Sequence, residues 1–278
     1  MNDLAVFFRS EWPEIERTFS RWQSAFAVQT RAATSLILEL AALRPGMRVL
    51  DLACGTGEPA LSVAREVGPT GRVVVTDLVP EAAAFVAELA RAARLTTVSA
   101  VGADAETLPF ESASFDAVTC RLGVMFFREP ERALAEARRV LKPGGRAGFV
   151  AWGSPEQPLF QATLGALNQG LPNASEVRPG PFRFAKPKTL ERTLAASGFP
   201  RALAREVRVP WPFPGVASEF WRAFQDLSGP SFQKELDVLL PAERAELDRR
   251  VLDALRPYER NGVTDPGAVF VAATGFND

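Results

Sequence analysis

The stretch Arg48-Val-Leu-Asp-Leu-Ala-Cys-Gly-Thr-Gly-Glu-Pro-Ala60 decides the fold of this 278-residue chain. Residues 49–52 form a short, mostly apolar run, which is typical of a buried parallel strand. Gly55 and Gly57 predict a tight turn after it, and residues 59–67 predict a helix that begins close to a proline. A strand, a glycine turn and a helix favour a phosphate- or nucleotide-bearing ligand, because glycine lets the backbone come close and free N–H groups at the helix start attract negative charge.

A second acid follows a second apolar run. Val73-Val-Val-Thr-Asp77 lies downstream of the glycine turn, at about the twenty-residue distance that nucleotide-binding folds use. A carboxylate at the tip of a second strand can accept hydrogen bonds from both hydroxyls of a ribose. The sequence therefore predicts a nucleoside-type ligand across the ends of the first two strands.

Two kinds of cofactor compete for this site: a nicotinamide or flavin dinucleotide, and S-adenosylmethionine. Gly55, Gly57 and Ala60 formally satisfy the dinucleotide fingerprint. Asp51 stands four residues before Gly55, where a carboxylate would repel a pyrophosphate but suit a cationic cofactor. Two later segments also point away from a dinucleotide, the acidic stretch 102–110 and Leu141-Lys-Pro-Gly-Gly145.

Five motifs in this order resemble the class I S-adenosylmethionine-dependent methyltransferases, with the closest likeness to the branch that includes the ubiquinone/menaquinone C-methyltransferases. The motifs are Asp51–Gly57, Thr76–Leu78, Ala103–Phe110, Ser114–Val118 and Leu141–Arg146. The resemblance covers roughly residues 45–153. It is much less specific for the substrate, because this fold hosts many methyl acceptors. One departure is Ala53, where the family often has glycine; alanine is a common small substitute.

The resemblance implies a role for each residue of the first motif. Asp51 would orient the motif loop and lie near the amino acid part of the cofactor. The backbone of Ala53, Gly55 and Gly57 would approach the methionine and the ribose, with Thr56 beside them.

The later motifs supply the remaining cofactor residues that the resemblance implies. Asp77 would hold the ribose hydroxyls, and Asp104 would accept a hydrogen bond from the adenine amino group. For each acid the alternative is a helix-capping or solvated loop residue. The other expected cofactor residues are Leu78 against the adenine, Ala105 and Glu106 next to Asp104, and Arg121 just past the fourth strand.

Composition limits the other functions. A net charge of −1 gives no basic excess, so we do not expect nucleic acid as a partner. No run of eighteen apolar residues exists, so we expect no membrane insertion and a cytoplasmic protein. The two cysteines, Cys54 and Cys120, make neither a disulfide framework nor a zinc site. Histidine is absent, which removes the usual general base and the commonest metal ligand; we predict no metal, and no catalytic residue can be named.

The expected architecture is an α/β, Rossmann-like, doubly wound sheet of seven strands, because strands and helices alternate over residues 47–153. The resemblance implies that the last strand is antiparallel. The expected strands are 49–52, 73–77, 98–101, 115–120, 146–152, 202–209 and 268–273. The helices expected among them are 80–94, 131–141, a piece near 159–171, and 188–197. The expected division is an N-terminal helical segment (1–44), a cofactor-binding core (45–153), and a segment with cap helices and the last two strands (154–278), its cap being the helical stretch 216–257.

An aromatic-rich cap predicts an apolar acceptor site. The first helix carries a stripe of large apolar residues at helical spacing, and the cap adds further rings. The alternative for every one of these side chains is ordinary core packing. The expected lining is Trp22, Phe26, Met125, Phe126, Trp152, Trp211, Phe220 and Trp221.

The sequence hypothesis is a methyltransferase that moves a methyl group to a small hydrophobic, aromatic or quinol-like acceptor by in-line displacement. Holding the nucleophile and the methyl collinear in a dry pocket is the main task of such an enzyme, and a base is needed only if the acceptor must lose a proton. The alternative is a non-catalytic subunit or regulator of the same fold that binds the cofactor. A NAD-dependent oxidoreductase is a distant third, and the sequence makes no prediction of oligomeric state.

Overall fold

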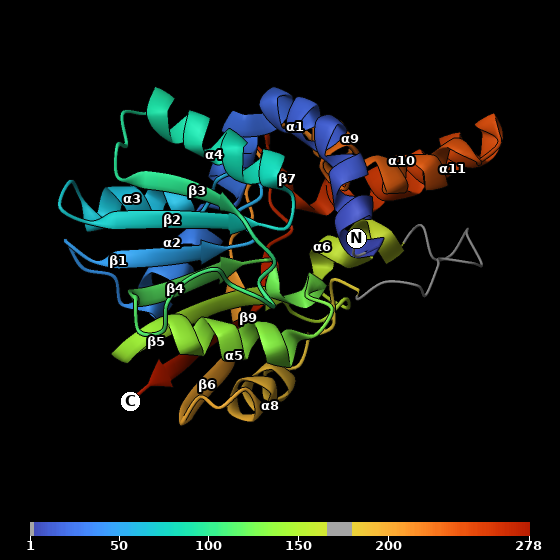
Figure 1. Cartoon of the computed structure of the whole chain (residues 1–278). Helices are drawn as coiled ribbons and strands as arrows, with labels where there is room; N and C mark the ends of the chain where they lie inside the picture. Colours follow the sequence, from blue (N-terminus) through green and yellow to red (C-terminus); the bar gives the residue numbers. More distant parts are fainter. Residues whose placement is uncertain (1–2, 166–179) are drawn as a thin grey trace.

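A computed structural model describes residues 3–165 and 180–278, and a seven-stranded sheet forms its centre (Figure 1). The strand order is β3-β2-β1-β4-β5-β9-β6. Strands β1 to β5 pair in parallel, and β9 runs antiparallel to both of its neighbours, as expected. The strands are β1 (Arg48–Leu52), β2 (Arg72–Asp77), β3 (Val98–Gly102), β4 (Phe115–Arg121), β5 (Leu141–Trp152), β6 (Arg201–Val209) and β9 (Ala268–Asn277).

Helices cover both faces of the sheet because the central strands are apolar on both sides. Val49 and Val73 pack against one group of helices, whereas Leu50 and Leu52 belong to the apolar cluster on the other face. This alternation follows from the two-residue period of a strand. The first group is α2 (Arg31–Ala41), α3 (Ala60–Val67) and α4 (Pro80–Ala92), and the second is α5 (Pro130–Val140) and α8 (Pro187–Ala196).

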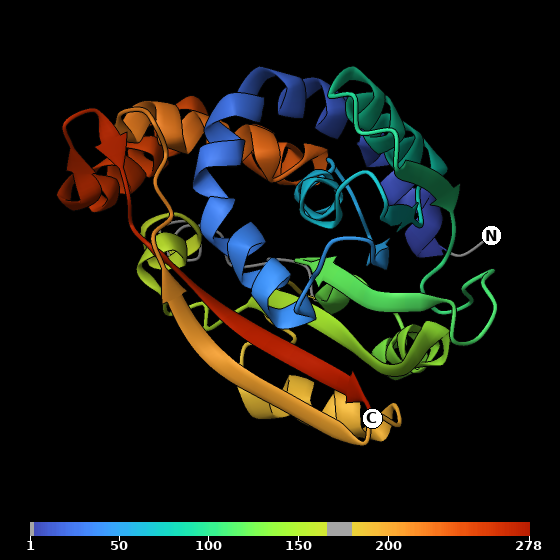
Figure 2. The ribbon, with the colours of Figure 1, turned by 90° about the vertical axis from the view of Figure 1, so that its left-hand side faces the viewer.

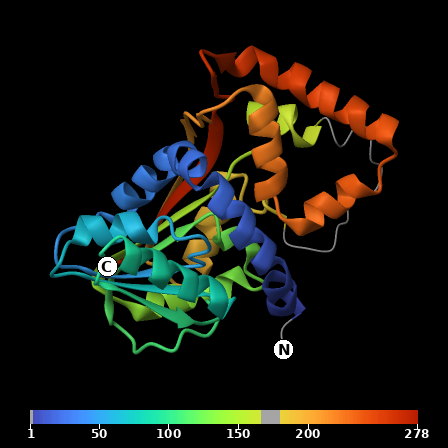
Figure 3. The ribbon, with the colours of Figure 1, turned by 90° about the horizontal axis from the view of Figure 1, so that it is seen from above.

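The carboxyl ends of the parallel strands face a layer of helices from two distant parts of the chain. α1 (Asp3–Gln29) lies on this side in Figure 1 and contacts α4, α9 and α10. The insertion between β6 and β9 projects to the same side, as the orange ribbon in Figure 3 shows. It contains α9 (Ala217–Leu227), α10 (Pro230–Asp237) and α11 (Pro241–Leu255). No helix among residues 3–165 and 180–278 has the length and apolar character that crossing a membrane requires.

The structure differs from the sequence prediction in local details, one of which is that β9 continues to Asn277, beyond its predicted end at residue 273. Two short strands, β7 (Glu259–Arg260) and β8 (Val263–Thr264), form a hairpin that was not predicted. Each strand is too short to show an alternation of apolar and polar residues. The turn between them is Asn261-Gly262, with both residues at positive φ, and this dipeptide is a strong sequence signal for a hairpin. β5 begins at Leu141 rather than at residue 146. Only α6 (Pro158–Ala162) represents the helix predicted near 159–171, whose part beyond residue 165 lies outside the described residues.

Candidate active site

The loop after β1 adopts a backbone that favours glycine. Ala53, Gly55 and Gly57 have φ angles of 52°, 47° and 107°. A Cβ built on Gly55 would meet nothing within 4 Å, because this residue borders an open cavity. Ala53 occupies the left-handed region with a side chain, at the position where the family often has glycine.

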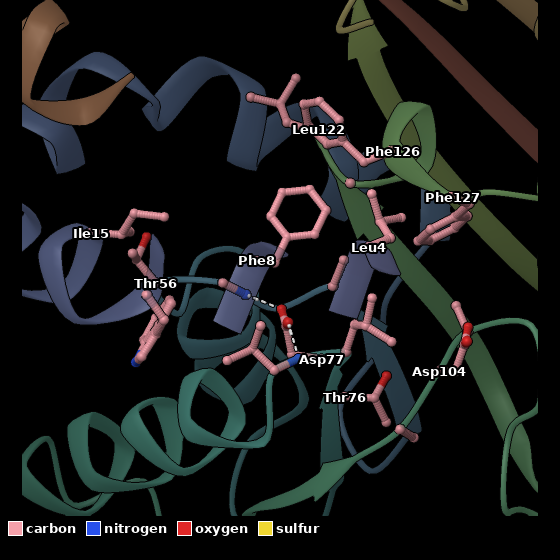
Figure 4. A pocket seen from close by; sticks show the side chains of 18 of the residues that line it. Leu4, Phe8, Ile15, Thr56, Thr76, Asp77, Asp104, Leu122, Phe126 and Phe127 are labelled. Carbon is pink, nitrogen blue, oxygen red and sulfur yellow. Dashed lines mark hydrogen bonds between the residues drawn. The ribbon is translucent and has the colours of Figure 1, made fainter. Parts of the chain in front are cut away.

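Asp77, at the end of β2, holds two loops together. Its Oδ2 accepts a hydrogen bond from the backbone N–H of Gly55 (3.0 Å), and its Oδ1 accepts one from Val79 (2.9 Å), as the dashed lines in Figure 4 show. Burial raises the pKa of Asp77 above its ordinary value, and the backbone N–H groups oppose this effect. Each carboxylate oxygen keeps a lone pair for a further donor.

The carboxylate cavity is a hollow of about 320 Å³ at the carboxyl ends of β1 to β4. Asp77, Asp104 and Glu106 lie on its lining, together with backbone of the loop after β1. Its opposite wall is made of α1 side chains, some of which Figure 4 shows above Asp77. These α1 residues are Leu4, Phe8, Trp12, Ile15, Phe19 and Phe26.

The loop after β3 is tied to the start of α5. Asp104 Oδ1 accepts a hydrogen bond from the backbone N–H of Glu106 (2.9 Å). The Glu106 side chain is 4% exposed; its Oε1 accepts a bond from the N–H of Glu129 (2.9 Å), and its Oε2 pairs with Arg128 (3.3 Å). The Asp104 carboxylate therefore has free capacity toward the cavity, whereas that of Glu106 is engaged within the protein.

Asp51 and Arg121 lie behind the motif loop and are not among the cavity-lining residues. Asp51 Oδ1 accepts a hydrogen bond from Thr119 Oγ1 (2.6 Å), and Oδ2 is buried with no partner among the described residues. Burial raises the pKa of Asp51 to about 7. Arg121 Nε donates to the carbonyl oxygen of Glu58 (3.1 Å) and Nη1 to Thr34 Oγ1 (3.2 Å), and burial lowers its pKa. Arg121 therefore holds the loop through Glu58, whereas the Asp51 carboxylate is bonded to β4.

The aromatic cavity, of about 470 Å³, adjoins the carboxylate cavity. Phe26, Leu122, Phe126 and Leu227 line both of them. The remaining wall comes from the end of α1, β5, α6, α9, α10 and the segments at Pro181 and Trp211, which lie far apart in the sequence. Its rings beyond the shared wall are Trp152, Phe160, Trp211, Phe220, Phe224 and Phe232.

Comparison with known proteins agrees with this geometry. Residues 50–149 match the family model described as a methyltransferase domain. The ubiquinone/menaquinone biosynthesis C-methyltransferase UbiE of Erwinia tasmaniensis is 35% identical over 175 residues, which cover 58% of this chain and 70% of that protein. A demethylmenaquinone methyltransferase of Deinococcus radiodurans is 36% identical over 164 residues, 55% of this chain and 67% of that one. The chain belongs to the S-adenosylmethionine-dependent methyltransferases.

Other relatives match over a shorter stretch. UbiE of Ralstonia pickettii is 43% identical over 122 residues, 44% of this chain and 50% of that protein. The chain thus spans about half the length of the first curated relatives that it matches. Among solved structures, YcgJ of Bacillus subtilis has a TM-score of 0.56 at 21% identity, covering 88% of this chain and 98% of that one. It has the same fold.

The residues present fit the cofactor of this methyltransferase family, S-adenosylmethionine. The carboxylate cavity offers acceptors to hydroxyl and amino groups, apolar α1 side chains to an adenine, and close backbone approach at Gly55. Its one lining arginine, among the described residues, is Arg128, which is paired with Glu106. A cationic nucleoside suits such a cavity better than a pyrophosphate does.

The structure places the residues predicted for the acceptor in two groups. Five of them line the aromatic cavity: Phe26, Phe126, Trp152, Trp211 and Phe220. Trp22, Met125 and Trp221 are not among its lining. Trp22 Nε1 donates to Asp226 (2.7 Å), Trp221 Nε1 donates to Asp248 (2.7 Å), and Met125 is fully buried in the core.

Sequence reasoning missed part of the lining of both cavities. The first half of α1 was interpreted as core packing, although its stripe of large apolar residues, continued back to Phe8, marks the wall of the carboxylate cavity. Phe8 makes an edge-to-face contact with Phe126 (ring centroids 6.1 Å apart), which joins α1 to the loop after β4. The missed rings of the aromatic cavity, Phe160, Phe224 and Phe232, belong to segments that the sequence identified only as helical.

Proposed function

We propose that this chain transfers a methyl group from S-adenosylmethionine to a small hydrophobic, aromatic or quinol-like acceptor by in-line displacement. The observation that carries the proposal is the pair of adjoining cavities, one edged with carboxylates and the other with aromatic rings, which share Phe26, Leu122, Phe126 and Leu227. A cofactor in the first cavity and an acceptor in the second would meet at this shared wall.

The carboxylate cavity would hold the cofactor through four parts of the chain. Asp77 would accept hydrogen bonds from the ribose hydroxyls, and Asp104 one from the adenine amino group. Leu78 and Ala105 would flank the adenine, and the loop at 53–57 would pass beside the methionine part. Glu106 and Arg121 would act indirectly, by fixing the loops that carry these groups, and Asp51 would lie beneath the motif loop, bonded to Thr119.

The aromatic cavity would orient the acceptor and exclude water. Bound S-adenosylmethionine supplies an electrophilic methyl group on a sulfonium. Apolar walls would keep the acceptor in one orientation toward the shared wall, and such positioning contributes several kcal/mol to the rate, roughly 7–11 in the best cases. No titratable side chain lines this cavity in the part of the chain that the structure describes, so the nucleophile would rely on its own acidity. The similarity to quinone C-methyltransferases supports a quinol-like acceptor.

Calorimetry followed by methyl transfer tests the proposal. S-adenosylmethionine and S-adenosylhomocysteine are titrated into the protein, with NAD as the control, and transfer of radiolabelled methyl is then measured to a panel of apolar phenols and quinols. Binding of both adenosyl compounds with label in an acceptor supports the enzyme. Binding without transfer to any of the panel favours the alternative, a non-catalytic subunit or regulator of the same fold. Binding of NAD alone would contradict both.

A further inference from the structure

Gln29, the last residue of α1, is a buried polar side chain on the wall of the aromatic cavity. It is 7% exposed, and its side-chain amide makes no hydrogen bond within residues 3–165 and 180–278. Other buried glutamines are paired: Gln157 exchanges hydrogen bonds with the backbone of Val269 (2.7 and 3.1 Å), and Gln225 accepts one from Arg244. The amide of Gln29 is not among the side-chain groups that are closed off without a partner, so it meets the cavity and is open to a hydrogen bond with a ligand.

The described residues around Gln29 offer no counter-charge to a charged ligand. Among the described residues that line the aromatic cavity, Asp, Glu, Lys and Arg are absent. Ser228, the other polar lining residue, is exposed, and its hydroxyl already donates to the carbonyl oxygen of Phe224 (2.6 Å). A carboxylate or ammonium group would therefore lose its water without gaining a counter-charge.

Gln29 lies next to the wall that the two cavities share. Phe26 stands three residues earlier on α1, so the two side chains lie on one side of the helix. Phe26 lines both cavities, whereas Gln29 lines only the aromatic one. A ring whose polar atom binds Gln29 is thereby held in a fixed orientation next to the shared wall.

We infer that Gln29 determines acceptor specificity, by hydrogen bonding to a neutral oxygen, a hydroxyl or a carbonyl, on an otherwise apolar ring. The inference rests on the proposed function, because it assigns the aromatic cavity to the acceptor. The amide can donate to either kind of oxygen and can accept from a hydroxyl. An apolar ring without such an oxygen leaves the amide unpaired, and a charged ring leaves its own charge unpaired.

Equilibrium dialysis with three matched probes tests this inference: 1-naphthol, 1-methylnaphthalene and 1-naphthoate, each with S-adenosylhomocysteine present. The wild type is expected to bind 1-naphthol about three- to tenfold more tightly than 1-methylnaphthalene, the range of one neutral hydrogen bond, and 1-naphthoate most weakly. Gln29→Leu should abolish the preference for 1-naphthol and leave the affinity for 1-methylnaphthalene equal or higher. Gln161→Leu, an exposed glutamine on α6 beside the cavity, is the matched control and should keep the preference.

If Gln29→Leu still prefers 1-naphthol, the inference is overturned. The same holds if the variant loses affinity for 1-naphthol and 1-methylnaphthalene equally. Gln29→Met, which keeps an unbranched side chain, repeats the test if the leucine variant does not fold. The two proposals fail separately. If the wild type transfers methyl groups but binds 1-naphthol and 1-methylnaphthalene equally, Gln29 has no such role. If the preference holds and no methyl group is transferred to any acceptor, the proposed function is wrong and Gln29 remains a binding residue.

Discussion

The carboxylate cavity and the aromatic cavity share a wall but are built in different ways. The first gathers backbone and acids from the consecutive loops after β1, β2 and β3, within residues 53–106, under a cover of α1. The second gathers side chains from α1, β5, α6, α9 and α10, and almost all of them are apolar. The proposed cofactor site therefore depends on a few short motifs, whereas the proposed acceptor site depends on packing between distant segments.

Among these predictions, replacement of Asp77 should have the largest effect, on ligand binding in the carboxylate cavity. Asp77→Ala removes the expected bonds to the ribose and the acceptor of the N–H groups of Gly55 and Val79. We expect affinity for S-adenosylhomocysteine to fall at least about a hundredfold, because hydrogen bonds to a charged group are worth roughly 1.5–3 kcal/mol each. Calorimetry measures the change. Asp116→Ala is the matched control at the opposite end of the sheet, and equal affinities of the two variants would contradict the role of Asp77.

The buried acid beneath the motif loop predicts a pH effect on stability. The pKa of Asp51 is about 7 in the folded protein and about 4 in an unfolded chain. Between these values the folded state holds a proton that the unfolded chain has released, so this group's contribution to the unfolding free energy falls as pH rises from about 4 to about 7. Asp51→Asn keeps an oxygen that can accept the hydrogen bond from Thr119, but it cannot ionise. The variant should therefore not lose unfolding free energy as the pH rises. We expect the variant to be more stable than the wild type at pH 8, by on the order of 2 kcal/mol, and urea unfolding at pH 5 and 8 measures it.

Asp116 gives the control for this pH effect, with the opposite sign. Burial opposes its ionisation, but hydrogen bonds from Lys142 and from the backbone N–H of Arg48 hold its pKa below the ordinary value. Asp116→Asn should therefore lose stability relative to the wild type above about pH 4, and the difference should shrink as the pH falls below that value. If Asp51→Asn behaves in the same way as Asp116→Asn, Asp51 is ionised in the folded protein.

A large side chain placed in the aromatic cavity should weaken binding there without affecting binding in the carboxylate cavity. Ala223, on α9, is 2% exposed and lines only the aromatic cavity. Ala223→Phe should weaken binding of 1-naphthol at least about tenfold, because overpacking of an occupied cavity costs roughly 1–3 kcal/mol, and it should leave the affinity for S-adenosylhomocysteine unchanged. Dialysis and calorimetry measure the two affinities. Arg222→Phe, on the exposed side of the same helix, is the control; a parallel loss of both ligands in Ala223→Phe would mean that the cavities are not independent.

The smallest expected effect concerns the backbone of the motif loop. Ala53→Gly relieves a positive φ of 52° and should raise the unfolding free energy by about 0.5–1 kcal/mol, after the greater freedom of glycine in the unfolded chain is subtracted. Urea unfolding at constant pH measures the change. Ala90→Gly in α4, a buried position with helical φ, should be destabilised, which gives a control of opposite sign. A destabilised Ala53→Gly would show that the alanine methyl group packs usefully.

Local sequence was enough to place the parts of the carboxylate cavity. Asp77 and Asp104 follow strands that pair in parallel, and such strands bring their ends to one edge of a sheet, so chain order alone puts the acids together. The roles of these side chains toward the cofactor remain predictions. The same reasoning could not show that Asp51 and Arg121 are not among the residues that line the cavity, because that depends on the direction of each side chain.

Contacts between distant segments could not be predicted from spacing. The prediction for Trp22 used its place on an apolar stripe, but its indole N–H donates to Asp226, 204 residues away. Nothing in the sequence singled out Gln29, because polar residues are common at helix ends and its burial is visible only in the structure. The Asn261-Gly262 turn was present in the sequence and was overlooked because its strands are so short.

The place of β9 has a consequence for synthesis on the ribosome. In the sheet, β6 pairs with β9 alone, and Figure 2 shows the two strands side by side at one edge. Residues 201–209 leave the ribosome before residues 268–277 exist, so the nascent β6 has no strand to join. Unpaired strand edges attract other chains. The sheet can be completed only after residues 268–277 have emerged, and until then β5 and β6 both lack the strand that joins them in the folded protein.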